Sequence, residues 1–132
     1  MDSIRYFKLH NSAAFVVRIG VEVTDNDGKI YEVEKDGYDD ICAGAERTFD
    51  LKNDPNRTIA PGYKVRLKAI VVGGSDKLAE ESFIYDPNSS KTARYKITGS
   101  LFGKTLHFED CNSFLNKLVK QKVKTHLRFS PF

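Results

Sequence analysis

Tryptophan is absent from this 132-residue chain, and cysteine, methionine and histidine are scarce. The two cysteines, Cys42 and Cys111, lie far apart and without CxxC spacing, and His10, His107 and His126 form no ligand-spaced pair with them. Structural zinc sites use four Cys or His ligands at short, regular spacings, so no zinc site is predicted. We expect two reduced, mostly buried thiols, while a disulfide between them stays open as the alternative.

Long apolar runs are also missing. No stretch approaches the ~20 apolar residues that a membrane-spanning helix needs. The N-terminus, Met1 to Tyr6, lacks the basic start and the apolar core of a signal peptide. The chain is therefore expected in the cytoplasm if Met1 is its native start, or outside the cell if a leader was removed, and the sequence does not decide between the two.

The sequence contains none of the common catalytic signatures. The patterns GxSxG, HExxH, GxxxxGK[ST] and GxGxxG do not occur. Ser12 follows His10 closely, but no acidic residue is placed to orient that histidine. We predict that the protein is not an enzyme and needs no cofactor. A small hydrolase whose site forms only on folding stays open, because catalytic triads are defined by geometry and not by order.

The composition is that of an ordinary globular domain, with 40% hydrophobic and 30% charged residues. A chain of this length fits one domain and buries roughly two-thirds of the surface that it exposes when unfolded. The net charge of +3 conceals an asymmetry. Residues 111–132 carry five basic residues and no acidic one, a charge of +5, so the rest of the chain carries −2.

Alternation of apolar and polar residues is the clearest pattern in the sequence. Every second residue from Phe15 to Val23 is apolar, and the run ends at Asp25-Asn26-Asp27-Gly28, where the residue types suit a tight reversal. Lys29–Glu34 alternates again, which predicts a β-hairpin. Further strands are predicted over Tyr63–Val71, Tyr6–His10, Arg47–Leu51, Ser82–Tyr85, Thr92–Thr98 and Leu101–Phe108.

About eight short strands with frequent turn signals predict an all-β fold, namely an antiparallel β-sandwich of the jelly-roll or immunoglobulin-like kind. Residues 111–122 then place apolar side chains at the i, i+3, i+4 and i+7 spacing of an amphipathic helix. We predict a sandwich domain over 1–109 and a basic C-terminal helix and tail over 110–132, packed on the same domain. Alternation over Lys122–Phe129 leaves a last edge strand as the alternative.

Acidic loops supply the candidate ligand-binding residues, which are Asp25, Asp27, Tyr38, Asp39 and Asp40. Binding residues commonly lie on loops that a rigid scaffold positions, and clustered carboxylates suit Ca²⁺. Hairpin tips also favour Asp, Asn and Gly for conformational reasons alone, so no metal site is predicted and Ca²⁺ stays an open alternative. The leading hypothesis is a non-enzymatic binding module whose acidic loops, at one end of the sandwich, bind a protein, a glycan or a Ca²⁺-dependent ligand.

The basic C-terminal helix supports a second hypothesis. Lys117, Lys120 and Lys124 share its polar face, which suits an anionic membrane surface or an acidic partner. Nucleic-acid binding is not predicted, because the rest of the chain is not basic and its aromatic residues occupy core-facing strand positions. The sequence leaves the ligand and the oligomeric state open, a homo-oligomer included.

Overall fold

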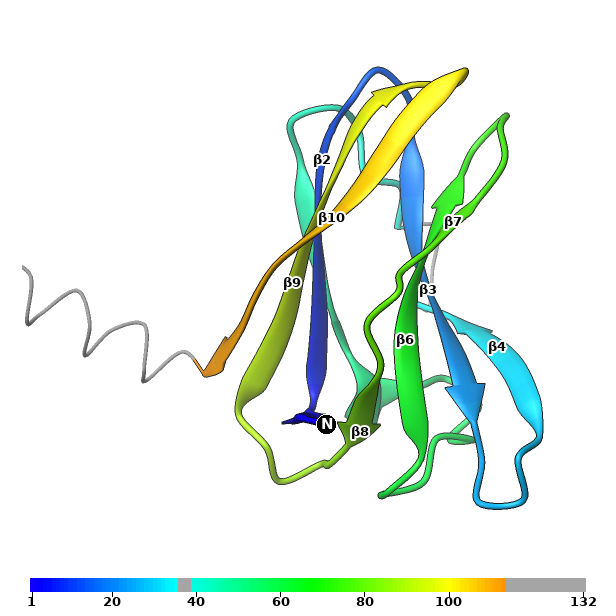
Figure 1. Ribbon diagram of the computed structural model, residues 1–132, viewed down its shortest axis with the longest axis vertical. Coiled ribbons are helices and arrows are strands. Elements are labelled where there is room, and N and C mark those ends of the chain that lie inside the picture. Colours follow the sequence, from blue (N-terminus) through cyan, green and yellow to red (C-terminus); the bar gives the residue numbers. More distant parts are fainter. Residues whose placement is uncertain (36–38, 114–132) are drawn as a thin grey trace, which may run out of the picture.

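A computed structural model describes residues 1–35 and 39–113, which form a β-sandwich of two sheets (Figure 1). One sheet has the strand order β1-β8-β6-β3-β4, with β7 paired to β6, and the other has the order β10-β9-β2-β5. In the described residues the strands are β1 (Ser3–Ile4), β2 (Tyr6–Ala13), β3 (Val17–Thr24), β4 (Ile30–Glu34), β5 (Glu46–Asp50), β6 (Lys64–Val71), β7 (Lys77–Leu78), β8 (Phe83–Tyr85), β9 (Lys91–Ser100) and β10 (Gly103–Ser113), and one 3₁₀ turn, η1, spans Leu51–Asn53.

The apolar residues at every second strand position form the core, as the sequence predicted. In β3 and β6 the apolar side chains at every second position are buried, and Val17, Val21 and Leu67 are fully inaccessible to solvent. The side chains of β2 and β9 that point toward the other sheet include Phe7 and Tyr95, which belong to the same core. Burying side chains of this size contributes roughly 1.5–3 kcal/mol each before conformational entropy is counted, so the interlayer packing is the main stabilising feature.

Four aromatic rings close the sandwich between β10 and β8. Phe7 lies 6.0 Å from Phe83 and 6.2 Å from Tyr95, centroid to centroid, and Phe108 lies 5.3 Å from Tyr95. These tilted and edge-on geometries are the favourable ones for aromatic pairs. The prediction that most aromatic residues serve the core is confirmed for Phe15, Phe49, Phe83, Tyr85 and Tyr95, whereas Tyr31 and Tyr63 are half-buried.

The prediction of a purely antiparallel sandwich is wrong, because each sheet is mixed. β2 and β9 pair in parallel over eight residues, from Tyr6 opposite Thr92 to Ala13 opposite Gly99. β1 and β8 form a short second parallel pair. Alternation within a strand reports which side chains face the core, but it carries no information about which strand becomes the neighbour. The parallel pairs are therefore visible only in the structure.

The predicted helix does not begin at residue 111. β10 continues to Ser113, and Cys111 and Asn112 lie opposite Ala93 and Thr92 of β9. β10 thus crosses the proposed boundary at 109/110, and the remainder of the predicted helix, like the alternative strand over 122–129, lies outside the described residues. Both cysteines are free, but Cys42 is exposed, which corrects the expectation of a buried thiol. No helix in residues 1–35 or 39–113 has the length and apolar character that crossing a membrane requires.

Candidate functional site

The predicted acidic residues at the β3–β4 turn serve that turn. One oxygen of the Asp25 carboxylate accepts hydrogen bonds from the backbone N–H of Asp27 and of Lys29, both at 2.9 Å. Gly28 adopts a φ of 83°, a left-handed conformation that glycine adopts without strain. An Asp at the start of a turn commonly binds its own backbone in this way. The Asp25 carboxylate is therefore engaged in shaping the reversal.

Asp39 and Asp40 lie elsewhere in the molecule. Asp40 accepts a 2.5 Å hydrogen bond from Arg18, near the start of β3, whereas Asp25 follows the end of the same strand. Seven residues of extended chain separate these positions by roughly 20 Å. Asp39 pairs with Lys35 and with Arg47, and the hydrogen bond from Lys35 is the largest of the effects that lower its pKa.

The acidic candidates are thus split between two places. Asp25, Asp39 and Asp40 already hold backbone donors or basic partners, and Asp27 takes part in the turn through its backbone N–H. Among residues 1–35 and 39–113, no three His, Cys, Asp or Glu side chains are grouped as a metal ion requires. Tyr38, the aromatic residue singled out in the same loop, lies outside the described residues, as do Lys117, Lys120 and Lys124. The candidate site must therefore be sought in another part of the fold.

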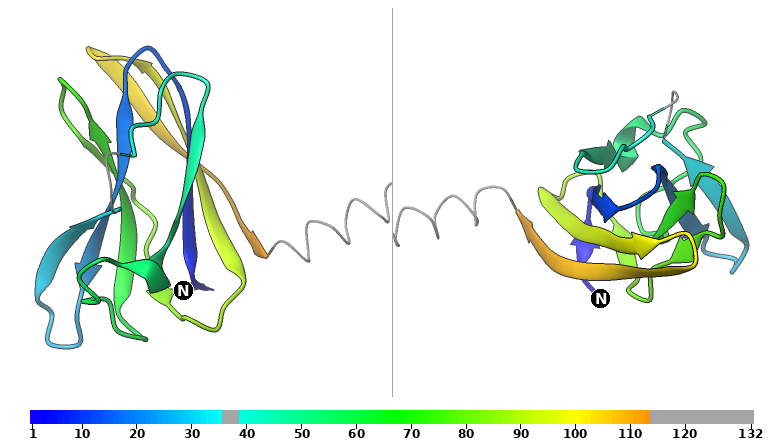
Figure 2. Two further views of the ribbon diagram at one scale, coloured as in Figure 1. Left: turned by 180° about the vertical axis from the view of Figure 1, so that it is seen from behind. Right: turned by 90° about the horizontal axis from the view of Figure 1, so that it is seen from above.

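A different feature emerges from the topology. Because β2 and β9 run in parallel while β5, β10 and β3 run the other way, four chain reversals gather at the end of the sandwich remote from the N-terminus (Figures 1 and 2). These reversals are residues 13–17, 41–45, 71–75 and 99–103, and none of their twenty residues is Asp, Glu, Lys, Arg or His. We call this surface the uncharged end.

A buried amide organises the uncharged end from inside. The side chain of Asn11 is fully buried, and its Nδ2 donates to the carbonyls of Phe15 at 2.6 Å and Ile41 at 2.8 Å. Its Oδ1 accepts the backbone N–H of Ala13 at 2.9 Å. The backbone of Asn11 also exchanges hydrogen bonds with residues 44 and 45. One neutral residue therefore joins two of the four reversals without placing a charge at the surface.

Glycines and one lysine hold the β9–β10 hairpin against its neighbour. Gly99 has a φ of 105°, and a Cβ at this position would lie 2.1 Å from the carbonyl oxygen of Gly103, so only glycine fits. Leu101 packs on Gly74, where a Cβ would approach its Cδ2 to 2.9 Å. Lys104 donates a 2.6 Å hydrogen bond to the carbonyl of Ser75 and so ties β10 to the β6–β7 turn.

The outer surface of the uncharged end is apolar. Phe102, at the tip of the β9–β10 hairpin, is 100% exposed, and Val72 and Leu101 are 42% and 38% exposed. Ala14, Cys42 and Ala43 are exposed beside them. Single exposed apolar residues are ordinary on protein surfaces, but exposed apolar residues gathered on four charge-free reversals are a feature that marks an interaction surface. Sequence reasoning missed it, although each charge-free turn is visible in the sequence.

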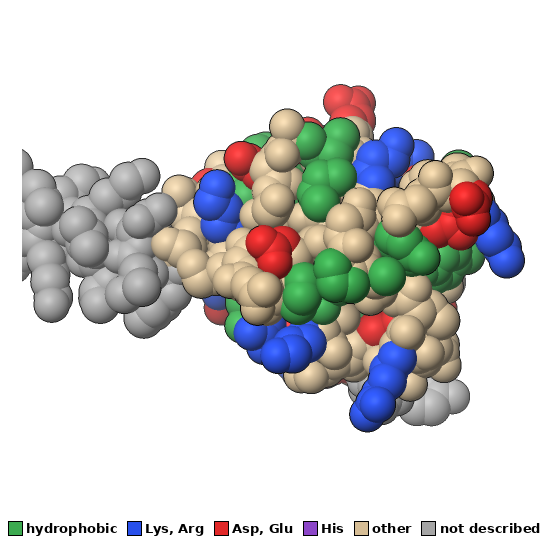
Figure 3. Space-filling model, turned by 90° about the horizontal axis from the view of Figure 1, so that it is seen from below, with side chains coloured by type: hydrophobic (Ala, Val, Ile, Leu, Met, Phe, Trp, Pro, Cys, Tyr) green, Lys and Arg blue, Asp and Glu red, His purple; other side chains and the backbone are tan. Residues whose placement is uncertain are grey.

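The opposite end, which we call the charged end, contains residues 25–29, 52–58 and 86–91 and is built from turns rich in Asp, Asn, Lys and Pro. Figure 3 looks onto this end and shows acidic and basic side chains interspersed with hydrophobic ones. Asp54 is buried there and accepts hydrogen bonds from the backbone N–H and the hydroxyl of Thr58, at 2.7 and 2.9 Å. The charged end thus has its own internal anchor, which is a carboxylate.

Comparisons with known proteins leave the family open. No protein-family model and no curated protein matches this chain. Solved structures with a related arrangement include the membrane-binding domain of pneumolysin, at 14% identity over 80% of this chain and 95% of that one with a TM-score of 0.42. Intermedilysin in a structure with human CD59 is 15% identical with a TM-score of 0.44, and a Gram-negative toxin is 16% identical with a TM-score of 0.40.

In both of those toxin structures the match covers 78–79% of this chain. The chain spans about a quarter of the length of the larger toxins, covering 23% of the intermedilysin chain and 22% of the Gram-negative toxin. Likeness at this level concerns the arrangement of strands and carries no functional argument.

Proposed function

We propose that this chain is a non-enzymatic binding domain that attaches through its uncharged end to the surface of a lipid bilayer. The observation that carries the proposal is the fully exposed Phe102 at the tip of a hairpin, among four reversals that contain no charged residue. An aromatic ring in water is costly, and burying one Phe side chain in an apolar phase contributes roughly 1.5–3 kcal/mol.

The shape of the surface favours a bilayer over a protein. Leu101 and Phe102 project from the end of the sandwich, whereas stable protein interfaces usually seat an aromatic anchor in a pocket with a polar rim. A projecting apolar tip enters the region between headgroups and acyl chains without any need for a matching cavity. The four reversals carry no charge of their own, so inserting the exposed side chains at their tip dehydrates no ionised group. The ammonium group of Lys104, bound to the carbonyl of Ser75, is expected to stay at the level of the headgroups.

The depth of contact is limited by what lies behind the tip. Glu46, Asp76 and Lys104 follow the uncharged reversals directly, and the reversals themselves contain backbone groups that need hydrogen-bond partners. We therefore expect shallow insertion of Phe102, Leu101 and Val72 and no span. Burying only three side chains contributes little binding free energy, so binding should be weak and reversible. Several linked copies of the domain would bind more strongly, because each bound copy raises the effective concentration of the next.

Absence of tryptophan makes the test direct, because a single introduced Trp is the only indole in the chain. Phe102→Trp places the probe at the uncharged end. Ile30→Trp places a matched probe at a 62% exposed residue of β4 that directly follows the 25–29 turn of the charged end. With phosphatidylcholine vesicles, we expect the emission of the Phe102→Trp variant to shift to shorter wavelength and that of Ile30→Trp to stay unchanged.

The shift should change little with salt, because the side chains expected to insert, Phe102, Leu101 and Val72, carry no charge. Equal responses from both variants, or no response at saturating lipid, would contradict the proposal. A soluble protein that changes the emission of Phe102→Trp while vesicles do not would reassign the uncharged end to protein docking.

A further inference from the structure

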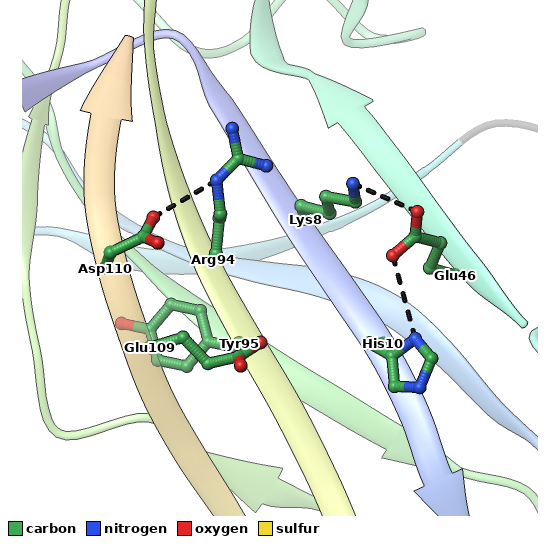
Figure 4. A pocket seen from close by; sticks show the side chains of 7 residues that line it. All are labelled: Lys8, His10, Glu46, Arg94, Tyr95, Glu109 and Asp110. Carbon is green, nitrogen blue, oxygen red and sulfur yellow. Dashed lines mark ion pairs between the residues drawn. The ribbon is translucent and has the colours of Figure 1, made fainter. Parts of the chain in front are cut away.

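A shallow hollow of about 130 Å³ lies on the outer face of the four-stranded sheet. All four strands of that sheet contribute side chains to it, as Figure 4 shows. The hollow is lined by Lys8, Arg94, Glu46, Glu109 and Asp110, together with His10 and the edge of Tyr95. We call it the sheet-face pocket. It lies on the side of the sandwich and is separate from the uncharged end.

A β-bulge places two consecutive carboxylates in the sheet-face pocket. Phe108 lies opposite Tyr95 and Asp110 lies opposite Arg94, so Glu109 is an extra residue without a partner on β9. Neighbouring residues of a regular strand point to opposite faces, yet Glu109 and Asp110 both line the same hollow. Bulges that re-aim a side chain in this way are frequent beside functional sites.

Arg94 is largely buried in the pocket wall but makes no hydrogen bond there. Its side chain is only 14% exposed, and its Nε lies 3.1 Å from Oδ1 of Asp110. The N–H does not point at that oxygen, so the two charges attract without a hydrogen bond, and both atoms are buried. Neither Nη of Arg94 donates to a described residue. Only Nε of the guanidinium is buried without a hydrogen bond, so the two Nη groups remain accessible as a planar pair of donors that suits a carboxylate ligand.

Of the two glutamates in the pocket, one forms ion pairs and one does not. Glu46 is held by Lys8 at 3.0 Å and by His10 at 3.6 Å, and the hydrogen bond from Lys8 is the largest of the effects that lower the Glu46 pKa. Glu109 has no hydrogen bond or ion pair with any described residue. The uncommitted groups of the pocket are therefore one cationic fork, on Arg94, and one free carboxylate, on Glu109.

We infer that the sheet-face pocket binds a small zwitterion with one carboxylate and one ammonium group, of which a free amino acid is the simplest example. The carboxylate would accept from the two Nη groups of Arg94, and the ammonium group would face Glu109. A simple anion is disfavoured because three carboxylates line the pocket against Lys8 and Arg94. The volume corresponds to roughly four waters, which suits a ligand of a few heavy atoms.

Backbone-amide chemical shifts in a titration with glycine test the inference. We expect saturable shifts in β9 and β10 as glycine is added. Acetate and methylammonium should each bind at least tenfold more weakly than glycine. Arg94→Lys keeps the positive charge and removes the fork, and Glu109→Gln removes the free carboxylate with little change of shape. Each should weaken glycine binding about tenfold or more, as the loss of a charge-assisted hydrogen bond does.

Lys64→Gln, at an exposed position of the other sheet, is the matched control and should leave binding unchanged. The inference fails if glycine produces no saturable shifts in the folded wild-type chain. It also fails if acetate binds as well as glycine and Glu109→Gln has no effect, because the pocket would then hold anions only. Both outcomes leave the proposed membrane contact untouched, since the pocket and the uncharged end share no residue.

Discussion

The two ends of this sandwich solve the same problem of reversing the chain with different residues. At the charged end, Asp25, Asp54 and Asp86 each accept backbone N–H groups of their own turns. At the uncharged end, the carbonyls are satisfied from within by the amide of Asn11, and tight reversals rely on glycine. The β6–β7 turn is the exception at this end, because the Asp76 carboxylate accepts the backbone N–H of Val71 at 2.9 Å. The two reversals that Asn11 joins, residues 13–17 and 41–45, need no such carboxylate, so their exposed residues can be apolar.

The comparison also explains why acidic turn residues are poor indicators of a binding site here. A carboxylate that caps its own turn has part of its hydrogen-bonding capacity already used. A turn without such residues must be stabilised by groups elsewhere in the fold. Its exposed side chains are then not required for the turn and can serve binding instead. The difference between the ends therefore points to the uncharged end as the contact surface.

The largest effect is expected from Asn11, the internal anchor of the uncharged end, with Asp54 of the charged end as its comparison. Asn11→Ala removes three side-chain hydrogen bonds, which should cost about 3 kcal/mol of unfolding free energy. The carbonyl of Phe15 loses its donor, whereas that of Ile41 keeps the backbone N–H of Val17 at 3.2 Å. Asp54→Ala should cost about half as much, since its loop lies closer to water. Urea denaturation of both variants measures this, and equal losses would show that the ends are anchored alike.

An intermediate effect is expected from glycine substitutions in matched turns. Gly99→Ala combines a left-handed φ with a clash against the backbone of Gly103, and it should cost roughly 2–3 kcal/mol. Gly28→Ala has a similar φ but open space around it, and it should cost roughly 1 kcal/mol. Thermal unfolding compares the two, and a Gly28→Ala variant less stable than Gly99→Ala would contradict the tighter packing of the uncharged end.

The sequence predicted much of this fold, because alternation depends only on which face of a strand is buried. Buried positions such as Ile19 and Leu67 follow from it directly. Residues 111–113 were predicted as helix because a local apolar spacing suited one, but pairing with β9 outweighs that local preference. The parallel pairing of β2 with β9 and the bulge at Glu109 depend on strand partners, which no local pattern reports.

The candidate site was less predictable for the same reason. The acidic residues of two successive loops are near in sequence, yet β4 carries them to different parts of the molecule. The four uncharged reversals are far apart in sequence and meet only through the topology. A search for charge-free turns would have found each segment, but it would not have shown that they form one surface.

The smallest effect is expected from acid, and it should fall mainly outside the uncharged end. Burial raises the pKa of Asp50, but hydrogen bonds from Arg5 and from the backbone of Lys52 outweigh it and leave that pKa below its ordinary value. A carboxyl with a lowered folded pKa contributes stability above its unfolded pKa and loses it as the pH falls through the folded value. Stability should therefore decline below about pH 4.

Asp50→Asn should make that decline shallower in urea denaturation across pH 2–6. Asn11 carries no titratable group, so the Asn11→Ala variant should keep the same acid dependence as the wild type at a lower overall stability. A wild-type profile that is flat down to pH 2 would contradict the role given to the Arg5–Asp50 pair.

Quenching by lipids with brominated acyl chains tests the central claim most directly, because bromine quenches indole only where the two come into contact. In vesicles of such lipids, the account predicts strong quenching of the Phe102→Trp variant and none of the Ile30→Trp variant. Quenching of neither, or of both to the same extent, would show that the uncharged end is not the surface that meets the bilayer.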